Sequence, residues 1–230
     1  ILQDASGSFK NTIPNVQNAL KTLTTFVKEE EYDENNPRLV KTDNPDTSDR
    51  VMMATFQGAD GYNYYYNNDF TGRKDVYGSW GPDYDYKYKA SNLSSDQNDI
   101  HQFINNIKVA GGTPTVPAID DVIAQYNERK GNMANGRKTI FLLITDGVAN
   151  GKRDPDGKVR LEYSDYRNNI LTRAWNFNEL TEASQNVLGR VKEVKEASTR
   201  LKNVVGSEGT VVVGFWEDVT IFANSKAQYY

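Results

Sequence analysis

The 230-residue chain contains no cysteine and a single histidine. The lack of cysteine excludes disulfides, thiolate metal sites and cysteine nucleophiles, and it is compatible with a cytosolic protein or with an exported one. The histidine, His101, precedes Ile104 and Ile107 in a segment with helical spacing. We therefore expect His101 on a helix surface and not in a catalytic centre.

Long apolar runs are also missing. Hydrophobic residues make up 37% of the chain, the mean hydropathy is −0.71, and no run approaches the roughly 20 apolar residues of a membrane span. We expect no membrane insertion. The net charge of −4 and the sequence pI of about 5.2 argue against a nucleic-acid partner. Because the polar residues gather in particular segments, one domain that carries insertions is favoured over one domain with a single sizeable core.

Apolar strand patterns alternate with amphipathic helix patterns along the chain. Helices are predicted over about residues 13–29, 94–107, 117–126 and 180–201, and strands before Asp4 and over residues 50–56, 140–144 and 211–216. This order predicts an α/β fold with a doubly wound, Rossmann-like, mostly parallel sheet and helices on both faces. Residues 83–89 alternate strictly between aromatic and charged or polar side chains, which predicts one antiparallel edge strand.

Two polar segments interrupt the pattern, and we treat them as insertions. The first, about residues 58–94, contains eight of the fourteen tyrosines. The second, about residues 151–178, contains a turn at Asp154-Pro155-Asp156-Gly157 and a possible hairpin arm at residues 159–163. The paired aspartates of that turn could suggest calcium, but the remaining loop ligands are missing, which favours a plain turn.

The domain organisation follows from these patterns. We expect one domain over residues 1–230 with the two insertions. Ile1 already has the pattern of the middle of a strand, so we expect the chain to be an excerpt of a longer multidomain protein. The stretch at residues 35–49 is rich in Asn, Asp and Pro, and it is predicted to be a loop.

Three short polar motifs lie beside the predicted strands and helices. Residues 4–8 read D-x-S-x-S directly after a strand, residues 145–147 place an Asp at the tip of the most apolar strand, and residues 111–113 form a glycine pair followed by Thr just before a helix. In a doubly wound sheet these loops meet outside the carboxyl ends of the strands. Carboxylate and hydroxyl oxygens suit a hard cation such as Mg²⁺.

In this order and context the motifs resemble the metal-ion-dependent adhesion site of the von Willebrand factor A family. The resemblance implies the metal ligands Asp4, Ser6, Ser8, Thr113 and Asp146. Thr113 is preferred to Thr115 because the family's Thr follows the glycines directly. The implied metal is Mg²⁺, with Mn²⁺ as a possible substitute, and its open coordination position takes an Asp or Glu carboxylate of a partner protein.

The chain is similar to the von Willebrand factor A domains of Gram-positive pilus and surface adhesins. That similarity implies an extracellular address on the bacterial surface or pilus, a role in virulence, and a host extracellular-matrix or plasma glycoprotein of the fibrinogen, fibronectin or collagen class as partner. An intracellular assembly module of the same family, working with a chelatase or an AAA-type ATPase, is the alternative. Sequence on either side of the chain would distinguish the two.

The aromatic residues of the first insertion are candidates for contact with the partner. They are Tyr64, Tyr65, Trp80, Tyr84 and Tyr86. Tyr and Trp combine rigid contact area with a polar tip and are favoured at recognition surfaces. They could also stack on sugar rings, which makes carbohydrate binding a further alternative, or they could pack the insertion's own small core.

No enzyme activity is expected from the sequence. There is no candidate general base near the motifs, no phosphate loop of the Walker type and no usable histidine. Both insertions begin where a predicted parallel strand ends. We therefore predict that the insertions flank the metal and build walls around it.

Overall fold

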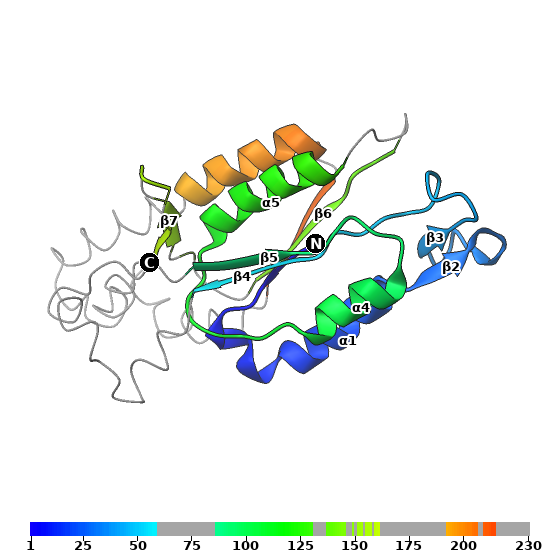
Figure 1. Ribbon diagram of the computed structural model, residues 1–230, viewed down its shortest axis with the longest axis horizontal. Helices are drawn as coiled ribbons and strands as arrows, with labels where there is room; N and C mark the ends of the chain where they lie inside the picture. The colour runs from blue at the N-terminus through cyan, green and yellow to red at the C-terminus, as the bar shows by residue number, and fades with distance from the viewer. Residues whose placement is uncertain are drawn as a thin grey trace, which may run out of the picture.

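A parallel sheet with one antiparallel edge strand forms the centre of the molecule. The computed structural model describes residues 1–58, 86–130, 137–145, 149, 151–153, 155–157, 159–161, 192–206 and 209–214. The five strands of the sheet are β1 (Leu2–Asp4), β4 (Ala54–Gly58), β5 (Tyr86–Ala90), β6 (Phe141–Thr145) and β9 (Thr210–Gly214), in the order β5-β4-β1-β6-β9 (Figure 1). Only β5 runs antiparallel to its neighbour.

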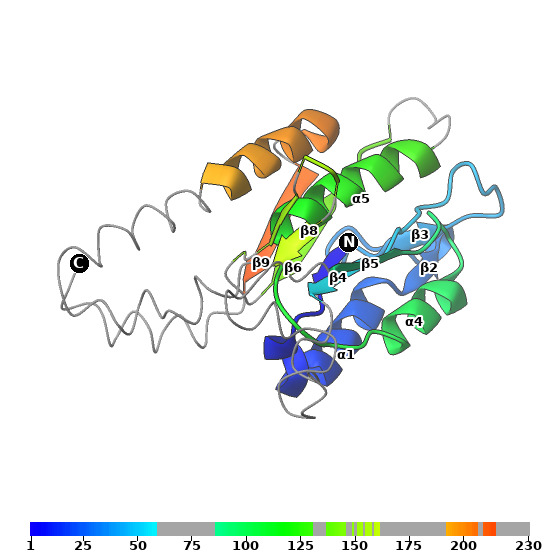
Figure 2. The same ribbon diagram turned by 60° about the vertical axis from the view of Figure 1, so that its left-hand side comes forward.

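Helices cover both faces of this sheet. α1 (Ile13–Leu23) and α4 (Gln97–Asn105) lie on one face, and α5 (Thr115–Arg129) and a helical stretch at residues 192–205 lie on the other (Figures 1 and 2). The predicted fold class is therefore confirmed: a doubly wound, Rossmann-like α/β fold with a mostly parallel sheet and an antiparallel edge strand.

Alternating side chains of the central strands divide the core in two. Leu2, Phe56 and Leu143 face α5 and the 192–205 helix, where they pack with Ile119 and Leu201. The opposite face of the sheet packs against α1 and α4 through a second set of buried side chains that includes Phe9, Leu20, Met53, Ile100 and Ile104. β1 is buried along its whole length, as expected for the middle strand of a parallel sheet.

The first helix is shorter than its apolar spacing predicts. α1 ends at Leu23, and residues 26–28 form β2 (Phe26–Lys28), which pairs in parallel with β3 (Leu39–Lys41). The hydroxyls of Thr24 and Thr25 each donate to the carbonyl four residues earlier at 2.7 Å. β-Branched residues that bond back to the helix in this way favour its end, so the prediction of a helix to residue 29 is wrong. β3 likewise replaces part of the predicted loop at residues 35–49.

Other boundaries shift by a few residues. α4 begins after Asp96, whose carboxylate accepts the backbone N–H of Asn98 at 2.8 Å and so caps the helix. The predicted strand at residues 50–56 starts only at Ala54, while Val51 forms an isolated bridge with Ser94. A 3₁₀ turn, η1 (Gly7–Asn11), follows β1, and another, η2 (Glu29–Glu31), follows β2.

The second insertion begins with a hairpin. β7 (Gly151–Arg153) pairs antiparallel with β8 (Val159–Leu161), which confirms the predicted hairpin arm for these residues. Gly157, in the turn, has φ of 84°, a conformation that favours glycine. In the part of the chain that the structure describes, no helix is both long and apolar enough to cross a membrane.

Candidate metal-binding loops

Asp4 lies at the carboxyl end of the central strand, β1, and each of its two carboxylate oxygens accepts a hydrogen bond. Its side chain is fully buried. Oδ1 accepts the backbone N–H of Ser6 at 2.8 Å, and Oδ2 accepts the hydroxyl of Thr145 at 2.7 Å. Because β1 pairs in parallel with β6, the end of each strand reaches the same edge, and the contact with Thr145 spans the two. The carboxylate is thus fixed in orientation.

The two serines of the D-x-S-x-S motif lie together beside Asp4. Their hydroxyl oxygens are 2.9 Å apart. Ser6 is 1% exposed, whereas Ser8, in η1, is exposed. The motif therefore runs from a buried carboxylate to a hydroxyl at the surface. The expected grouping of one carboxylate and two hydroxyls on one side of a tight loop is present in the structure.

The glycine-rich loop before α5 pairs with this first loop through its backbone. The N–H of Gly7 donates to the carbonyl of Gly111 at 2.9 Å, and the N–H of Ala110 donates to the carbonyl of Ala5 at 2.9 Å. Gly111 has φ of 65°, and a Cβ on Gly7 would lie 3.4 Å from the Gly111 carbonyl oxygen. Gly111 therefore favours glycine for its backbone conformation, whereas a Cβ on Gly7 would make an ordinary van der Waals contact.

Two threonines follow these glycines, and they lie in different environments. Thr113 is buried in the loop, and Thr115 is the buried first residue of α5. The hydroxyl of Thr115 donates to the carbonyl of Thr113 at 3.4 Å. The Thr115 hydroxyl thus faces the backbone of its own turn.

Asp146, the fifth expected ligand, lies outside the described residues. Thr145, which directly precedes it, ends β6 and contacts Asp4. The sequence reasoning missed Thr145, although a hydroxyl at the carboxyl end of a strand next to β1 is a usable signal. Among the described residues, no group of three or more His, Cys, Asp or Glu side chains could hold a metal.

The spacing of the hydroxyls fits an octahedral ion. Two ligands in adjacent octahedral positions at 2.0–2.1 Å from Mg²⁺ lie about 2.9 Å apart. The oxygens of Ser6 and Ser8 have this separation. Neutral hydroxyls next to a buried carboxylate form a hard, oxygen-only donor set. The residues present at this edge therefore fit a magnesium or manganese ion.

The aromatic candidates are only partly placed. Tyr64, Tyr65, Trp80 and Tyr84 lie outside the described residues. Tyr86 begins β5, and its hydroxyl donates to Oδ2 of Asp121 at 2.7 Å. Burial and the Asp121 carboxylate raise the pKa of Tyr86 above its usual range. Its polar tip is thus engaged within the domain.

The fold and the loops define a doubly wound α/β domain with a polar cluster at the carboxyl edge of its parallel strands. No family model matches the chain. It is 57% identical over 234 residues to Platelet adherence protein A of Streptococcus gordonii, an alignment that covers 100% of this chain and 6% of the relative. The chain thus corresponds to a small part of that protein.

A solved structure with a remote likeness is the open conformation of the pilus adhesin SpaC from Lactobacillus rhamnosus GG. The TM-score is 0.41 and the sequence identity is 13%, over 99% of this chain and 29% of that one. A likeness at this level does not locate a site.

Proposed function

We propose that this chain is a metal-dependent adhesion module of the von Willebrand factor A type, from a Gram-positive surface protein, that binds a host plasma or extracellular-matrix glycoprotein. The observation that carries the proposal is the convergence of Asp4, Ser6 and Ser8 with the glycine-rich loop at one edge of the sheet. Ligand sites of doubly wound folds lie at this edge.

In this proposal Ser6, Ser8 and Thr113 would hold the ion, with Asp4 and Asp146 as the charged members of the site. Asp4 supplies negative charge from a buried position, where few water molecules screen it. When bound, a divalent ion would supply a positive centre with an open coordination position for a partner's carboxylate. Ser8 is exposed, so the rim of the site is accessible to another protein.

The similarity to Platelet adherence protein A supports the adhesive role and the choice of partner class. Over its whole length this chain is 57% identical to a segment of that protein. We infer a location on the bacterial surface or pilus, where a host glycoprotein of the fibrinogen, fibronectin or collagen class supplies the Asp or Glu. A binding role without catalysis follows from the same proposal.

The test is binding of the chain to immobilised fibrinogen, fibronectin and collagen. Binding is measured with Mg²⁺, with EDTA, and after Mg²⁺ or Mn²⁺ is added back. We expect EDTA to abolish binding and the added ions to restore it. Asp146→Ala should abolish it as well, while Asp43→Ala serves as the matched control, because Asp43 is exposed and follows β3.

Calorimetry with Mg²⁺ alone separates the metal from the partner. The wild-type chain should bind Mg²⁺ at one site, and the Asp146→Ala variant should not bind it. Binding to these glycoproteins that ignores both EDTA and Asp146→Ala would overturn the proposal. The proposal would also be overturned if the wild type and Asp146→Ala released or absorbed the same heat on addition of Mg²⁺.

A further inference from the structure

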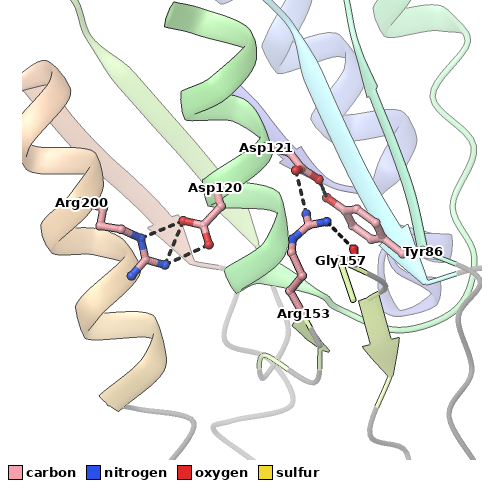
Figure 3. Close-up of polar contacts among 6 residues, drawn as sticks. All are labelled: Tyr86, Asp120, Asp121, Arg153, Gly157 and Arg200. Carbon is pink, nitrogen blue, oxygen red and sulfur yellow. Dashed lines mark hydrogen bonds and ion pairs between the residues drawn. The ribbon is translucent and has the colours of Figure 1, made fainter. Parts of the chain in front are cut away.

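A polar junction joins three separate segments on the α5 side of the sheet. Asp121 accepts the hydroxyl of Tyr86 on Oδ2 at 2.7 Å and the guanidinium of Arg153 on Oδ1 at 2.7 Å (Figure 3). Arg153 also donates to the carbonyl of Gly157 at 3.0 Å, and its guanidinium carbon lies 6.0 Å from the centre of the Tyr86 ring. One carboxylate thus contacts β5, and through Arg153 it is linked to β7 and to the turn that leads to β8.

Two of the three segments, those of Asp121 and Arg153, are next in sequence to residues that the proposed function uses. Tyr86 is the first residue of β5 and follows residues 59–85. Asp121 lies in the second turn of α5, the helix that begins after the Thr113 loop. Arg153 ends β7, which follows the Asp146 loop. Figure 1 shows β7 beside the N-terminal part of α5.

We infer that Asp121 is a positioning residue that fixes the β7–β8 hairpin against α5 and β5, and so sets where the hairpin stands relative to α5, the helix that follows the Thr113 loop. Its effect on binding rests on the proposed function, but its effect on the hairpin does not. The hairpin is short, with three residues in each arm, and such a ribbon is not stable alone. It needs a contact of this kind to keep one position.

The strength of the junction comes from its combination of contacts. The Asp121 and Arg153 side chains are 29% and 36% exposed, and a lone ion pair with that exposure stabilises little. The half-buried hydroxyl of Tyr86 adds a charge-assisted hydrogen bond, and burial together with Asp121 raises the Tyr86 pKa. Three groups that share one carboxylate restrain the hairpin more than a single pair would.

The neighbouring residue provides a matched control. Asp120 accepts two hydrogen bonds from Arg200, at 2.8 and 2.9 Å, with side-chain exposures of 37% and 48% (Figure 3). This pair joins α5 to the 192–205 helix and makes no contact with the hairpin among the residues drawn. Asp120→Asn therefore removes the same charge from the same helix without touching the hairpin.

Because the chain has no cysteine, two introduced cysteines can be labelled cleanly. We suggest spin labels at Asp156→Cys in the hairpin turn and Asn127→Cys on α5, both exposed positions, with distances from pulsed electron resonance. Asp121→Asn should broaden the distance distribution, and Asp120→Asn should leave it narrow. Tyr86→Phe, which removes only one oxygen, should broaden it in the same direction. The double variant Asp121→Asn/Arg153→Gln should broaden it no further than Asp121→Asn alone.

Binding is then measured on unlabelled chains with immobilised fibrinogen and, by calorimetry, with Mg²⁺. We expect Asp121→Asn to weaken fibrinogen binding about fivefold, because the hairpin must be ordered on binding, while Mg²⁺ uptake is unchanged. Asp120→Asn should change neither. Equal distance distributions in Asp121→Asn and Asp120→Asn would overturn the inference, whatever fibrinogen binding shows. Wild-type binding that ignores EDTA would overturn the proposed function alone, and the label distances would still decide the role of Asp121.

Discussion

The hydroxyl of Thr145 donates to Oδ2 of Asp4 at 2.7 Å, and this contact joins the carboxyl ends of β6 and β1. Asp4 is fully buried, so its carboxylate depends on such donors for both its stability and its orientation. Thr145 therefore positions the charged residue at the centre of the candidate site. It also stands directly before Asp146, the other expected carboxylate.

Replacing Thr145 by Val removes this donor and keeps the shape of the side chain. We expect the free energy of unfolding to fall by about 1–2 kcal/mol, because a buried carboxylate loses a hydrogen bond. Magnesium affinity should fall by about tenfold, as it does when a residue that orients a metal ligand is lost. Urea unfolding and calorimetry measure the two effects.

Thr139→Val is the matched control for Thr145→Val. Its hydroxyl lies 2.6 Å from the Tyr126 hydroxyl, before the start of β6 and so at the other end of that strand. It should cost stability without changing magnesium affinity. Equal magnesium affinities in the two variants would contradict a positioning role for Thr145.

The two threonines after the glycine pair should differ in their effect on metal binding. Thr113→Val removes a hydroxyl expected to reach the ion, and we expect magnesium uptake to be lost. In Thr115→Val the missing hydroxyl bonded only weakly to the Thr113 carbonyl, at 3.4 Å, so uptake should persist. Calorimetry with Mg²⁺ on the two variants distinguishes the two threonines. Loss of Mg²⁺ uptake in Thr115→Val alone would assign the ligand to Thr115 and not to Thr113.

Removal of the hydroxyl at neutral pH should change the stability of the domain in different directions for Tyr86 and Tyr88. Tyr86→Phe removes the donor to Oδ2 of Asp121, whose Oδ1 still accepts Arg153, and should cost about 1 kcal/mol. The Tyr88 hydroxyl is buried and finds no hydrogen-bond partner among the described residues, so Tyr88→Phe should be neutral or stabilising by up to about 1 kcal/mol. Urea unfolding at pH 7 measures both, and a larger loss in Tyr88→Phe than in Tyr86→Phe would contradict these assignments.

The same tyrosines should make the domain sensitive to alkaline pH. Burial raises the pKa of both above the ordinary value of 10.0, with Asp121 adding to the effect. The unfolded chain loses these protons above about pH 10, whereas the folded domain keeps them. Stability is thus fully present below pH 10 and falls as the pH rises beyond it. Urea midpoints between pH 9 and pH 11 should fall less steeply in Tyr86→Phe than in wild type.

The β9 strand should promote self-association of the isolated chain. Val211, Val212 and Val213 are 45%, 59% and 40% exposed, and β9 is an edge strand of the described sheet. An uncharged apolar edge pairs readily with another chain. Val212→Lys should lower the fraction of dimers and larger species in sedimentation velocity. Leu23→Lys is the control, because Leu23 is a similarly exposed apolar residue at the end of α1, and it should leave the fraction of dimers unchanged. A similar decrease in both variants would indicate non-specific hydrophobic association and would contradict a special role of β9.

Sequence patterns predicted the sheet because a parallel strand buried on both faces leaves a continuous apolar run. Leu2, Phe56 and Leu143 belong to such runs and meet in one core. The pattern failed at Phe26 and Val27, whose spacing continues that of α1, because two threonines end the helix before them. Helical spacing alone does not record where a helix stops.

In the candidate site, too, some contacts were predicted from the sequence and others were not. The grouping of Asp4, Ser6 and Ser8 is local, and alternation along a tight loop was enough to predict it. The contacts of Thr145 with Asp4 and of Asp121 with Arg153 join residues that are 141 and 32 positions apart. The place of Thr145 at the end of a strand is a local signal, but the partner that it contacts, like the pairing of Asp121 with Arg153, is set by the three-dimensional fold.

Main-chain hydrogen bonds join the loop around Gly7 to the loop around Gly111. A side-chain substitution does not delete the groups that form these bonds. Side chains outside the proposed metal ligands can therefore change while these backbone bonds stay in place, provided that Gly111 keeps its positive φ. Evolution could thus change the partner that this edge of the sheet binds, while the backbone connection between the two loops stays the same.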